Sequence, residues 1–314
     1  MKILVTGGAG FIGSALAQRL VRAGHEVVVI DNFNDYYEVS LKRARADFFL
    51  KECTVIEGDI TDISFLKKVF KAHQFDTVCH LAAQAGVRYS VSNPRVYVDT
   101  NVSGTQNILE VMHEYGVTKM VYASTSSIYG NDTIAPFKED STGNQPVSMY
   151  AATKKGGELI AHVYSSLYGM DVTCLRFFTV YGPWSRPDMA MLKFAQMIDK
   201  DEAIDIYNNG ELKRDFTYID DIVDGFVKAV LNPQGYQIIN LGYGNPISVL
   251  KFVELLEEKL EKTAIKNLIS MQEADVYLTS ADTTKAKELL GFEARVSFEE
   301  GIAKFVQWYR GYFK

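Results

Sequence analysis

The feature that most constrains the fold is a glycine-rich loop between an apolar run and an amphipathic run at the start of the chain. Residues 2–6 are KILVT, and residues 7–13 are GGAGFIG. In such a loop Gly7 permits a tight turn, Gly10 lets a ligand approach the backbone, and Gly13 permits close helix–strand packing. A helix that begins here directs free N–H groups and the positive end of its dipole at the loop. The pattern predicts a dinucleotide pyrophosphate site at the end of a first strand.

The rest of the first half repeats the alternation of strand and helix. Strand-like apolar runs are expected near residues 3–6, 26–30, 54–57, 77–81, 120–124 and 172–177. Helical runs are expected near residues 12–23, 40–50, 64–72, 94–115 and 149–168. Strands that alternate with helices predict an α/β fold with a doubly wound parallel sheet. The strands are almost uniformly apolar, so we expect helices to cover both faces of this sheet.

Beyond about residue 180 this alternation ends. Glycine and proline mark an irregular loop over residues 182–187, and shorter elements follow. Helices are expected near residues 190–198, 222–231, 248–262, 284–290 and 298–309, and strands near 204–207 and 237–241. We predict a nucleotide-binding domain over residues 1–180, to which the strand near 237–241 returns, and a smaller mixed α/β substrate lobe over residues 181–314. Ligands of such folds bind in a cleft beyond the carboxyl ends of the strands.

Composition excludes several classes of protein. A net charge of -6 argues against nucleic-acid binding. No apolar run approaches the roughly 20 residues of a membrane helix, and the chain starts with a strand rather than a leader. Cys53, Cys79 and Cys174 are odd in number and far apart in apolar runs, so we predict free core thiols in a reducing cytoplasm. The five histidines have no metal-ligand spacing, and we predict no metal.

Carboxylates at two strand ends indicate which dinucleotide binds. Asp31 ends the second strand, where it can accept hydrogen bonds from the adenine ribose and would repel a 2′-phosphate. This favours NAD over NADP, although Asp31 could instead be an ordinary turn residue. Asp59 ends the third strand and could hydrogen-bond the adenine edge, or simply belong to a strand exit. The pattern predicts NAD contacts at Gly7, Gly10, Phe11, Ile12, Gly13, Asp31, Asn32, Asp59 and Ile60.

A catalytic group is predicted from Thr125, Tyr150 and Lys154. Tyr150 and Lys154 are four residues apart in a helical run, so both project from one face. The ammonium and an oxidised nicotinamide would lower the pKa of the phenol, which could then act as a base near neutral pH. The hydroxyl of Thr125 ends the preceding strand and can share the proton of the reacting oxygen. A packed tyrosine beside a solvated lysine is the alternative, and it is a poor explanation behind a glycine-rich strand–helix turn.

These segments carry a resemblance to a known family. Residues 5–13 (VTGGAGFIG), 80–83 (HLAA), 150–154 (YAATK) and 214–221 (RDFTYIDD) resemble the extended short-chain dehydrogenase/reductases, and among them the nucleotide-sugar epimerases, over essentially the full length. The resemblance implies a Rossmann fold, tightly held NAD, and a C-terminal lobe that grips a nucleoside diphosphate sugar. It also implies cofactor contacts at Lys42, Leu81, Ala82, Ala83, Gln84, Asn101, Tyr150 and Lys154.

The same relatives form dimers through a four-helix interface. The amphipathic runs near residues 96–112 and 149–168 could pair in this way with a second copy. Their periodicity fits burial within one chain equally well. We therefore expect a homodimer on the resemblance alone.

The reaction is predicted from the absence of acidic residues just after Thr125, at the end of the fifth strand. Relatives that dehydrate or decarboxylate nucleotide sugars carry acidic residues where this chain has Ser126 and Ser127. Without a general acid to expel water, 4,6-dehydration is disfavoured. Epimerisation at C4 needs no such acid. Tyr150 would take the O4 proton while C4 gives a hydride to NAD, and the 4-keto sugar would turn over and receive the hydride on its other face.

The sugar is predicted from residues 84–90 (QAGVRYS) and 179–190 (TVYGPWSRPDMA), which resemble the UDP-glucuronate 4-epimerases. A uronate carries a carboxylate at C6, to which serine and threonine hydroxyls can donate neutral hydrogen bonds and an arginine can add charge. By resemblance, Arg214 would bind the diphosphate and Asp275 the ribose, although the arginine usual near Asp275 is absent. The predicted substrate contacts are Arg88, Thr125, Ser126, Ser127, Tyr150, Thr179, Arg186, Arg214 and Asp275.

Three alternatives stay open. A UDP-glucose/UDP-galactose 4-epimerase would use the same chemistry on a neutral sugar and would need no carboxylate site. A UDP-glucuronate decarboxylase would release carbon dioxide and UDP-xylose. A dinucleotide-binding sensor or scaffold is disfavoured, because such proteins commonly lose the tyrosine or the lysine that this chain keeps.

Overall fold

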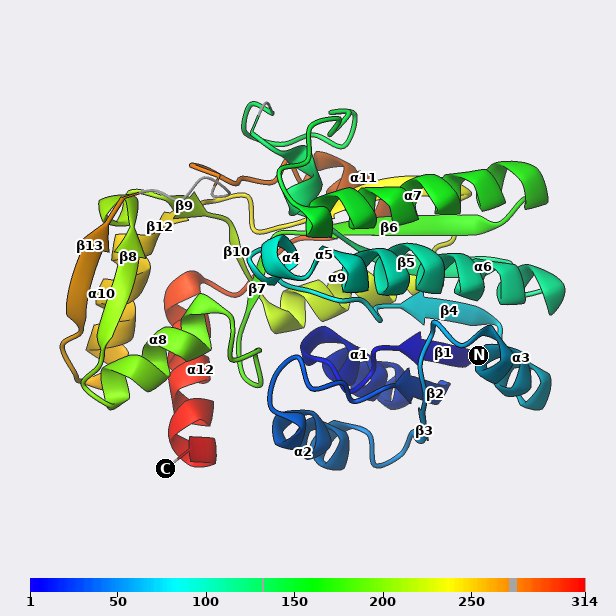
Figure 1. Ribbon diagram of the computed structural model, residues 1–314, viewed down its shortest axis with the longest axis horizontal. Coiled ribbons are helices and arrows are strands. Elements are labelled where there is room, and N and C mark those ends of the chain that lie inside the picture. Colours follow the sequence, from blue (N-terminus) through cyan, green and yellow to red (C-terminus); the bar gives the residue numbers. More distant parts are fainter. Residues whose placement is uncertain (132, 271–275, 314) are drawn as a thin grey trace.

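A seven-stranded parallel sheet forms the centre of the computed structural model, which describes residues 1–131, 133–270 and 276–313 (Figure 1). The strand order is β11-β6-β5-β4-β1-β2-β3. Every neighbouring pair in this sheet is parallel. The order reverses between β1 and β4, which is where ligands of doubly wound folds bind. The predicted α/β class and doubly wound sheet are confirmed.

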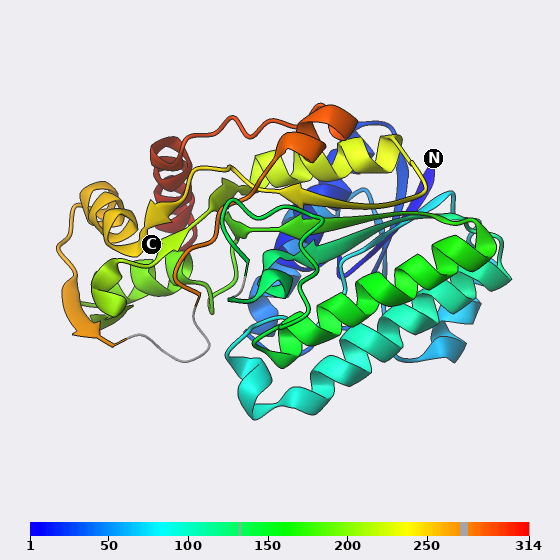
Figure 2. The ribbon, with the colours of Figure 1, turned by 90° about the horizontal axis from the view of Figure 1, so that it is seen from above.

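Helices cover both faces of this sheet. The strands are β1 (Lys2–Thr6), β2 (Glu26–Asp31), β3 (Thr54–Glu57), β4 (Thr77–His80), β5 (Lys119–Thr125), β6 (Asp171–Phe177) and β11 (Tyr236–Leu241). One face carries α3 (Ile63–Ala72), α6 (Thr105–Glu114) and α7 (Met149–Tyr168), which pack side by side (Figure 2). The other carries α1 (Phe11–Arg22), α2 (Val39–Phe49), α9 (Ile219–Leu231) and α11 (Thr284–Leu290).

Alternate residues in the middle of β1 show why apolar side chains dominate this strand on both faces. Ile3 and Val5 of β1 belong to the core beneath α1, whereas Leu4 belongs to the separate core on the opposite face. All three side chains are fully buried. Because both faces of the sheet are covered, the middle of this strand is apolar on both sides.

The single helix expected over residues 94–115 is interrupted. Pro94–Tyr97 form α5, Val98–Gly104 form a π-helical segment, and α6 begins at Thr105. A Cβ at Gly104 would lie 2.6 Å from Cδ1 of Ile60, so a larger residue would push this segment away from the loop after β3. Wide turns of this kind commonly occur at functional sites.

The C-terminal part adds three two-stranded sheets to the regions that the structure describes. They pair β10 (Phe216–Tyr218) with β7 (Thr179–Tyr181), β12 (Ile247–Ser248) with β9 (Lys213–Arg214), and β13 (Ile265–Ile269) with β8 (Ala203–Tyr207). The helices α8 (Ala190–Asp199), α10 (Val249–Leu260) and α12 (Phe298–Phe313) pack with them. Most of these strands escape sequence prediction, because runs this short show no measurable periodicity.

Two further expectations concern cysteines and membranes. Cys79 and Cys174 are buried, Cys53 is half-buried, and all three are free thiols. Burial raises the pKa of Cys53 to about 11, so its thiol is protonated at neutral pH. Among the helices of the described ranges, none combines the length and apolarity that a membrane crossing requires. Within the same ranges no cluster of histidine, cysteine or acidic side chains has a metal-binding arrangement.

Candidate functional site

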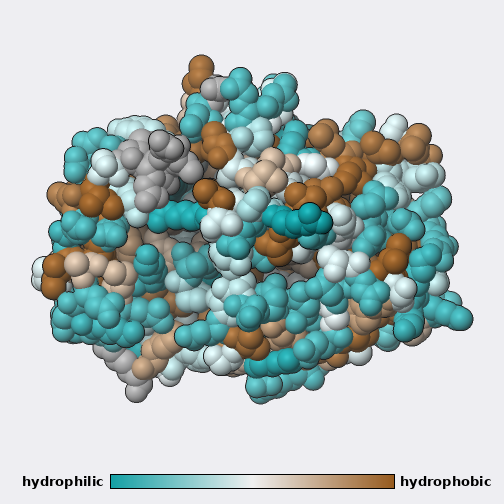
Figure 3. All heavy atoms as spheres, in the orientation of Figure 1, coloured by the Kyte–Doolittle hydropathy of each residue, from teal (hydrophilic) through white to brown (hydrophobic). Residues whose placement is uncertain are grey.

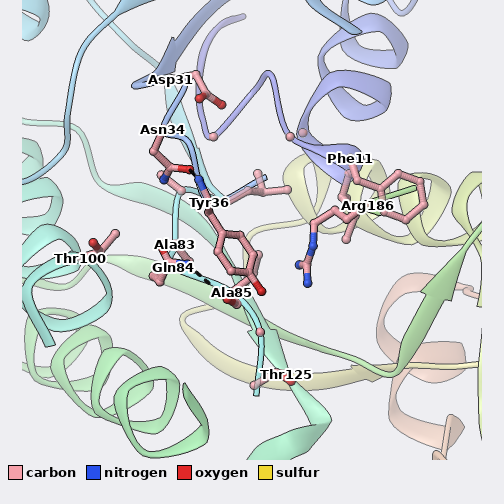
Figure 4. A pocket seen from close by; sticks show the side chains of 18 of the residues that line it. Phe11, Asp31, Asn34, Tyr36, Ala83, Gln84, Ala85, Thr100, Thr125 and Arg186 are labelled. Carbon is pink, nitrogen blue, oxygen red and sulfur yellow. Dashed lines mark hydrogen bonds between the residues drawn. The ribbon is translucent and has the colours of Figure 1, made fainter. Parts of the chain in front are cut away.

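A cavity lies beyond the carboxyl ends of the central strands, at the reversal of strand order (Figure 4). Its wall includes the glycine-rich loop, the ends of β2, β3 and β4, and the start of α7. The predicted cofactor residues that line it are Gly7, Gly10, Phe11, Ile12, Gly13, Asp31, Asn32, Lys42, Asp59, Ile60, Leu81, Ala82, Ala83, Gln84, Tyr150 and Lys154. Residues far apart in the sequence therefore meet in one cavity, as predicted from their positions at the carboxyl ends of the strands.

The glycine-rich loop has a shape that only glycine permits. Gly7 has a φ of +70°, and a Cβ there would lie 2.7 Å from the backbone nitrogen of Ala82. A Cβ at Gly13 would collide with the carbonyl oxygen of Gly7. Gly10 is the N-cap residue of α1. Because it has no side chain, it cannot accept hydrogen bonds from the free N–H groups in the first turn of the helix. These groups are left to a negatively charged ligand.

Asp31 ties this loop to the end of β2. Its two carboxylate oxygens accept hydrogen bonds from the N–H groups of Ala9 and Phe33, both at 2.9 Å. Burial raises the pKa of the carboxyl group, against these two hydrogen bonds and the charge of Lys42. An ionised carboxylate has about four acceptor positions, so two remain for ribose hydroxyls.

Asp59 and Lys42 are held by their own neighbours. Asp59 accepts hydrogen bonds from Thr61 and from Nδ2 of Asn32 at 2.7 Å. Burial alone would raise the pKa of Asp59, but these bonds outweigh it and lower the pKa. The Nζ atom of Lys42 donates to the backbone and side-chain oxygens of Asn34, both at 2.6 Å. Lys42 thus braces the loop after β2 while its side chain lines the cavity.

Asn101 differs from the other predicted cofactor residues, because it is not among those that line the cavity. It lies in the π-helical segment and is 1% exposed. Its side chain accepts a hydrogen bond from the Gln84 N–H at 2.8 Å and donates to the Gln84 carbonyl and to Thr153. The structure therefore places Asn101 behind the wall, where it fixes the loop after β4 against α7.

Thr125, Tyr150 and Lys154 come together at the floor of the cavity. Thr125 is the last residue of β5, and its hydroxyl lies near enough to the phenol of Tyr150 to lower the pKa of that phenol. Tyr150 and Lys154 lie in the first turns of α7, whose N-terminus is capped by the hydroxyl of Ser148. The predicted catalytic group is thus assembled in three dimensions.

Burial dominates the electrostatics of this group. Lys154 is 3% exposed, and burial lowers its pKa to about 7. Its Nζ lies 4.0 Å from the centre of the Tyr122 ring, which favours the ammonium form. Burial raises the pKa of Tyr150, against the hydrogen bond from Thr125 and the charge of Arg186. The lowered phenol pKa predicted from the sequence is therefore not produced by the groups of the chain alone.

A buried ion pair behind the catalytic group was not predicted from the sequence. Glu158 lies one turn beyond Lys154, and it accepts hydrogen bonds from Arg176 at 2.9 and 2.8 Å and from Ser124 at 2.7 Å. Burial would raise the pKa of Glu158, but Arg176 outweighs it and lowers the pKa. These contacts join α7 to the ends of β5 and β6, and so fix Tyr150 relative to Thr125. The sequence signal for this ion pair was a charged residue at an otherwise buried position in each of two elements, Glu158 in α7 and Arg176 in β6.

On the substrate side, Thr125, Tyr150, Thr179 and Arg186 line the same cavity. Ser126 and Ser127 are not among the lining residues and lie in the 3₁₀ turn that follows β5 (Ser126–Tyr129). Ser127 accepts a hydrogen bond from the Thr125 hydroxyl at 3.2 Å. Of the predicted carboxylate donors Ser126, Ser127 and Thr179, the structure thus places only Thr179 in the wall.

Arg88 and Arg214 lie outside the cavity wall. The Arg88 guanidinium stacks on the ring of Tyr207, 4.5 Å from its centre, and so connects the loop before α4 (Tyr89–Ser92) to β8. Arg214 donates to the carbonyl oxygens of Lys213 and Tyr277. Asp275 lies outside the described residues. The structure thus brings two of the predicted arginines to the C-terminal part and one, Arg186, into the cavity.

Arg186 is already bound to a carboxylate of the chain. Its Nε and Nη2 atoms donate to the two oxygens of Asp188 at 2.9 and 2.7 Å. The Tyr36 hydroxyl donates to the same aspartate at 3.0 Å. Burial would lower the pKa of Arg186, but Asp188 outweighs it and raises the pKa. Tyr36 and Arg186 point into the cavity from opposite sides (Figure 4).

The fold and this cavity define an α/β enzyme of the dinucleotide-binding class, with a tyrosine and a lysine at the reactive end. The family model described as "NAD dependent epimerase/dehydratase family" matches residues 3–242. The chain belongs to the NAD-dependent epimerase/dehydratase family. The resemblance inferred from residues 5–13, 80–83, 150–154 and 214–221 is confirmed.

Individual relatives are similar over the whole chain. The UDP-glucuronate 4-epimerase of Thermodesulfobacterium geofontis (strain OPF15) is 47% identical over 308 residues, which are 97% of this chain and 95% of that protein. The crystal structure of UDP-glucuronic acid 4-epimerase from Bacillus cereus with UDP-glucuronic acid and NAD has a TM-score of 0.93 at 36% identity, over 99% of each chain. UDP-glucose 4-epimerase from Thermotoga maritima has a TM-score of 0.91 at 33% identity over both whole chains.

Proposed function

We propose that this protein is an isomerase that interconverts UDP-glucuronate and UDP-galacturonate by NAD-dependent epimerisation at C4. The observation that carries the proposal is the assembly of Thr125, Tyr150 and Lys154 at one end of a dinucleotide cavity. The strand end beside them bears hydroxyl groups and no acid. Similarity to UDP-glucuronate 4-epimerases over nearly the full length supports the choice of a uronate.

The residues present fit NAD. Gly10 lines the cavity, and a Cβ there would lie 3.0 Å from the carbonyl oxygen of Gly7, so glycine lets the backbone itself face a pyrophosphate. Asp31 offers carboxylate oxygens to ribose hydroxyls and would repel a 2′-phosphate. When bound, NAD accepts a hydride from C4 of the sugar and returns it to the opposite face.

In this proposal Tyr150 moves the proton. Its phenolate accepts the O4 proton as C4 is oxidised, and the phenol returns that proton after the 4-keto ring has turned over. Thr125, whose hydroxyl lowers the pKa of the phenol, shares the proton with the reacting oxygen. Because burial raises the pKa of Tyr150, positive charge must be present for the phenolate to form near neutral pH. Lys154 holds the nicotinamide ribose and supplies part of that charge.

The hydroxyl groups protect the uronate carboxylate. The 4-keto intermediate is a β-keto acid, which loses carbon dioxide when its carboxylate aligns with the carbonyl π system. Thr179 in the wall provides a neutral donor that holds the carboxylate out of that alignment, and Ser126 and Ser127, in the turn behind Thr125, complete the hydroxyl-bearing strand end. Residues 1–180 would bind NAD, while residues 181–314 would grip the UDP moiety with the help of Arg88, Arg214 and Asp275.

We further propose a homodimer formed through the helices near residues 96–112 and 149–168. Leu159, Val163 and Leu167 follow one another at intervals of four residues on α7 and are 57%, 49% and 67% exposed. Hydrophobic side chains also gather over α7 in the space-filling view (Figure 3). An exposed apolar stripe of this kind is typical of a protein–protein contact. The three free thiols support a cytoplasmic location.

The proposal is tested by incubating the purified protein separately with UDP-glucuronate and UDP-glucose, without added NAD, and following the anomeric protons by NMR. UDP-galacturonate is the expected product. Turnover of UDP-glucose alone would favour the neutral-sugar epimerase, and UDP-xylose with carbon dioxide would favour the decarboxylase. Deuterium placed at C4 should remain in the product, because the hydride never exchanges with water.

A further inference from the structure

The starting observation is the ion pair between Arg186 and Asp188. The two donated hydrogen bonds, at 2.9 and 2.7 Å, run from one edge of the guanidinium to both carboxylate oxygens. This is the bidentate geometry in which arginine recognises carboxylates. The side chains are 24% and 31% exposed, so the pair is partly shielded from water.

The pair is fixed from both ends. Arg45 is fully buried and donates to the carbonyl oxygens of Trp184 at 2.9 Å and Ser185 at 3.2 Å, immediately before Arg186. The Tyr36 hydroxyl holds Asp188 from the loop after β2. The pair therefore connects the cofactor side of the cavity with the loop before α8.

The pair also lies where the sugar reacts. Arg186 lines the cavity together with Tyr150 and Thr179. The charges of both Arg186 and Asp188 act on the phenol of Tyr150. A sugar bound with its O4 at Tyr150 would therefore share the cavity with this guanidinium.

We propose that Asp188 is a positioning residue that occupies Arg186 and so keeps it from gripping the uronate carboxylate during epimerisation. The proposal rests on the function proposed above. A uronate carboxylate and the Asp188 carboxylate offer the same pair of oxygens, and this edge of the guanidinium can bind only one of them. With Arg186 occupied, the sugar carboxylate depends on neutral hydroxyl donors, whose bonds are weaker than charge-assisted ones. Weaker bonds are released more easily when the 4-keto ring turns over.

This assignment changes the role predicted for Arg186. The sequence pattern offers Arg186, like Arg88, as a source of charge for the sugar carboxylate, whereas the structure gives Arg186 a carboxylate of the chain. Removing the charge of Asp188 should convert Arg186 into a ligand of the sugar carboxylate. Uronates would then bind more tightly and turn over more slowly, while neutral sugars would be unaffected.

The test measures binding without chemistry. In NAD-loaded protein carrying Tyr150→Phe, titration calorimetry gives dissociation constants for UDP-glucuronate and for UDP-glucose. Adding Asp188→Asn should tighten UDP-glucuronate about tenfold, which equals about 1.4 kcal/mol, and leave UDP-glucose unchanged. Adding Arg186→Gln as well should remove the gain. With Tyr150 present, Asp188→Asn should lower kcat for UDP-glucuronate while it lowers KM.

Two further variants serve as controls for this test. Asp224→Asn removes an aspartate that pairs with Lys228 at 2.9 Å on α9, and should change neither affinity. Tyr36→Phe removes only the hydroxyl that holds Asp188, and should give a smaller gain for UDP-glucuronate alone. If Asp188→Asn does not fold, Tyr36→Phe replaces it in the binding comparison.

The proposal is overturned if both ligands change equally, if UDP-glucuronate binds more weakly, or if the gain survives Arg186→Gln. Each of these results would mean that Asp188 only braces its loop. If the proposed function itself is wrong, the unaltered protein will not turn over UDP-glucuronate. The binding comparison is unaffected by that result, because it needs no turnover.

Discussion

Lys154 should make the stability of the NAD-free protein depend on pH. Its ammonium is 3% exposed, and burial lowers its pKa from 10.5 to about 7. Between these values the unfolded chain binds a proton that the folded chain has released, so the free energy of unfolding rises with pH. The difference between 10.5 and about 7 amounts to about 5 kcal/mol at 1.36 kcal/mol per pH unit. About 3 kcal/mol of it falls between pH 7 and pH 9.5.

The assay compares the unaltered chain with Lys154→Met, in which the side chain keeps its length but cannot titrate. Urea unfolding of both, freed of NAD, is measured at pH 7 and at pH 9.5. The unaltered chain should gain about 3 kcal/mol relative to the variant over this range. As a control, Lys251→Met removes a lysine that is 54% exposed, and the same comparison should change far less. A difference between the chain and Lys154→Met that is equal at the two pH values would refute the reasoning, because it would mean that burial leaves this ammonium charged.

Three further predictions concern the proposed reaction and assembly. Tyr150→Phe should lower kcat by roughly 10²- to 10⁴-fold while the protein keeps its NAD, measured by product NMR and by cofactor release on denaturation; an undiminished rate would exclude the phenol as base. Thr179→Ala should raise the fraction of UDP-pentose by-product in NMR spectra of the reaction mixture, and an unchanged fraction would remove the role of the hydroxyl cluster. Val163→Glu places a charge on the exposed stripe of α7 and should convert a dimer to a monomer in sedimentation, whereas an intact dimer would place the interface elsewhere.

The fold was predictable because its signals are local and repeated. The glycine-rich turn at Gly7 can serve only a strand–turn–helix unit, and each later apolar run has the length and composition of a covered strand. Once the strands are parallel, their carboxyl ends lie at one edge of the sheet. Asp31 at the end of β2, Asp59 just after β3 and Thr125 at the end of β5 are therefore brought near one another by topology alone.

The substrate side was harder to predict, because its residues lie on loops. Ser126 and Thr125 are adjacent in sequence, yet only Thr125 lines the cavity, since the chain turns into a 3₁₀ helix after β5. Arg88 has the charge expected of a ligand, but its guanidinium stacks on Tyr207. Residue type and spacing do not determine the direction of a loop side chain, which depends on contacts with distant segments.

The hardest residues to predict were those that position other side chains without touching a ligand themselves. Arg186 and Asp188 are two residues apart, a spacing at which side chains do not face each other on a helix. They meet in the turn over residues 186–189, where the Met189 N–H donates to the Arg186 carbonyl oxygen at 3.1 Å. Arg45 on α2 fixes the residues just before this turn by donating to the Trp184 carbonyl oxygen. The same argument applies to Glu158 on α7, whose partner Arg176 lies on β6. A motif can identify the groups that touch a substrate, but the charges that orient those groups follow from packing.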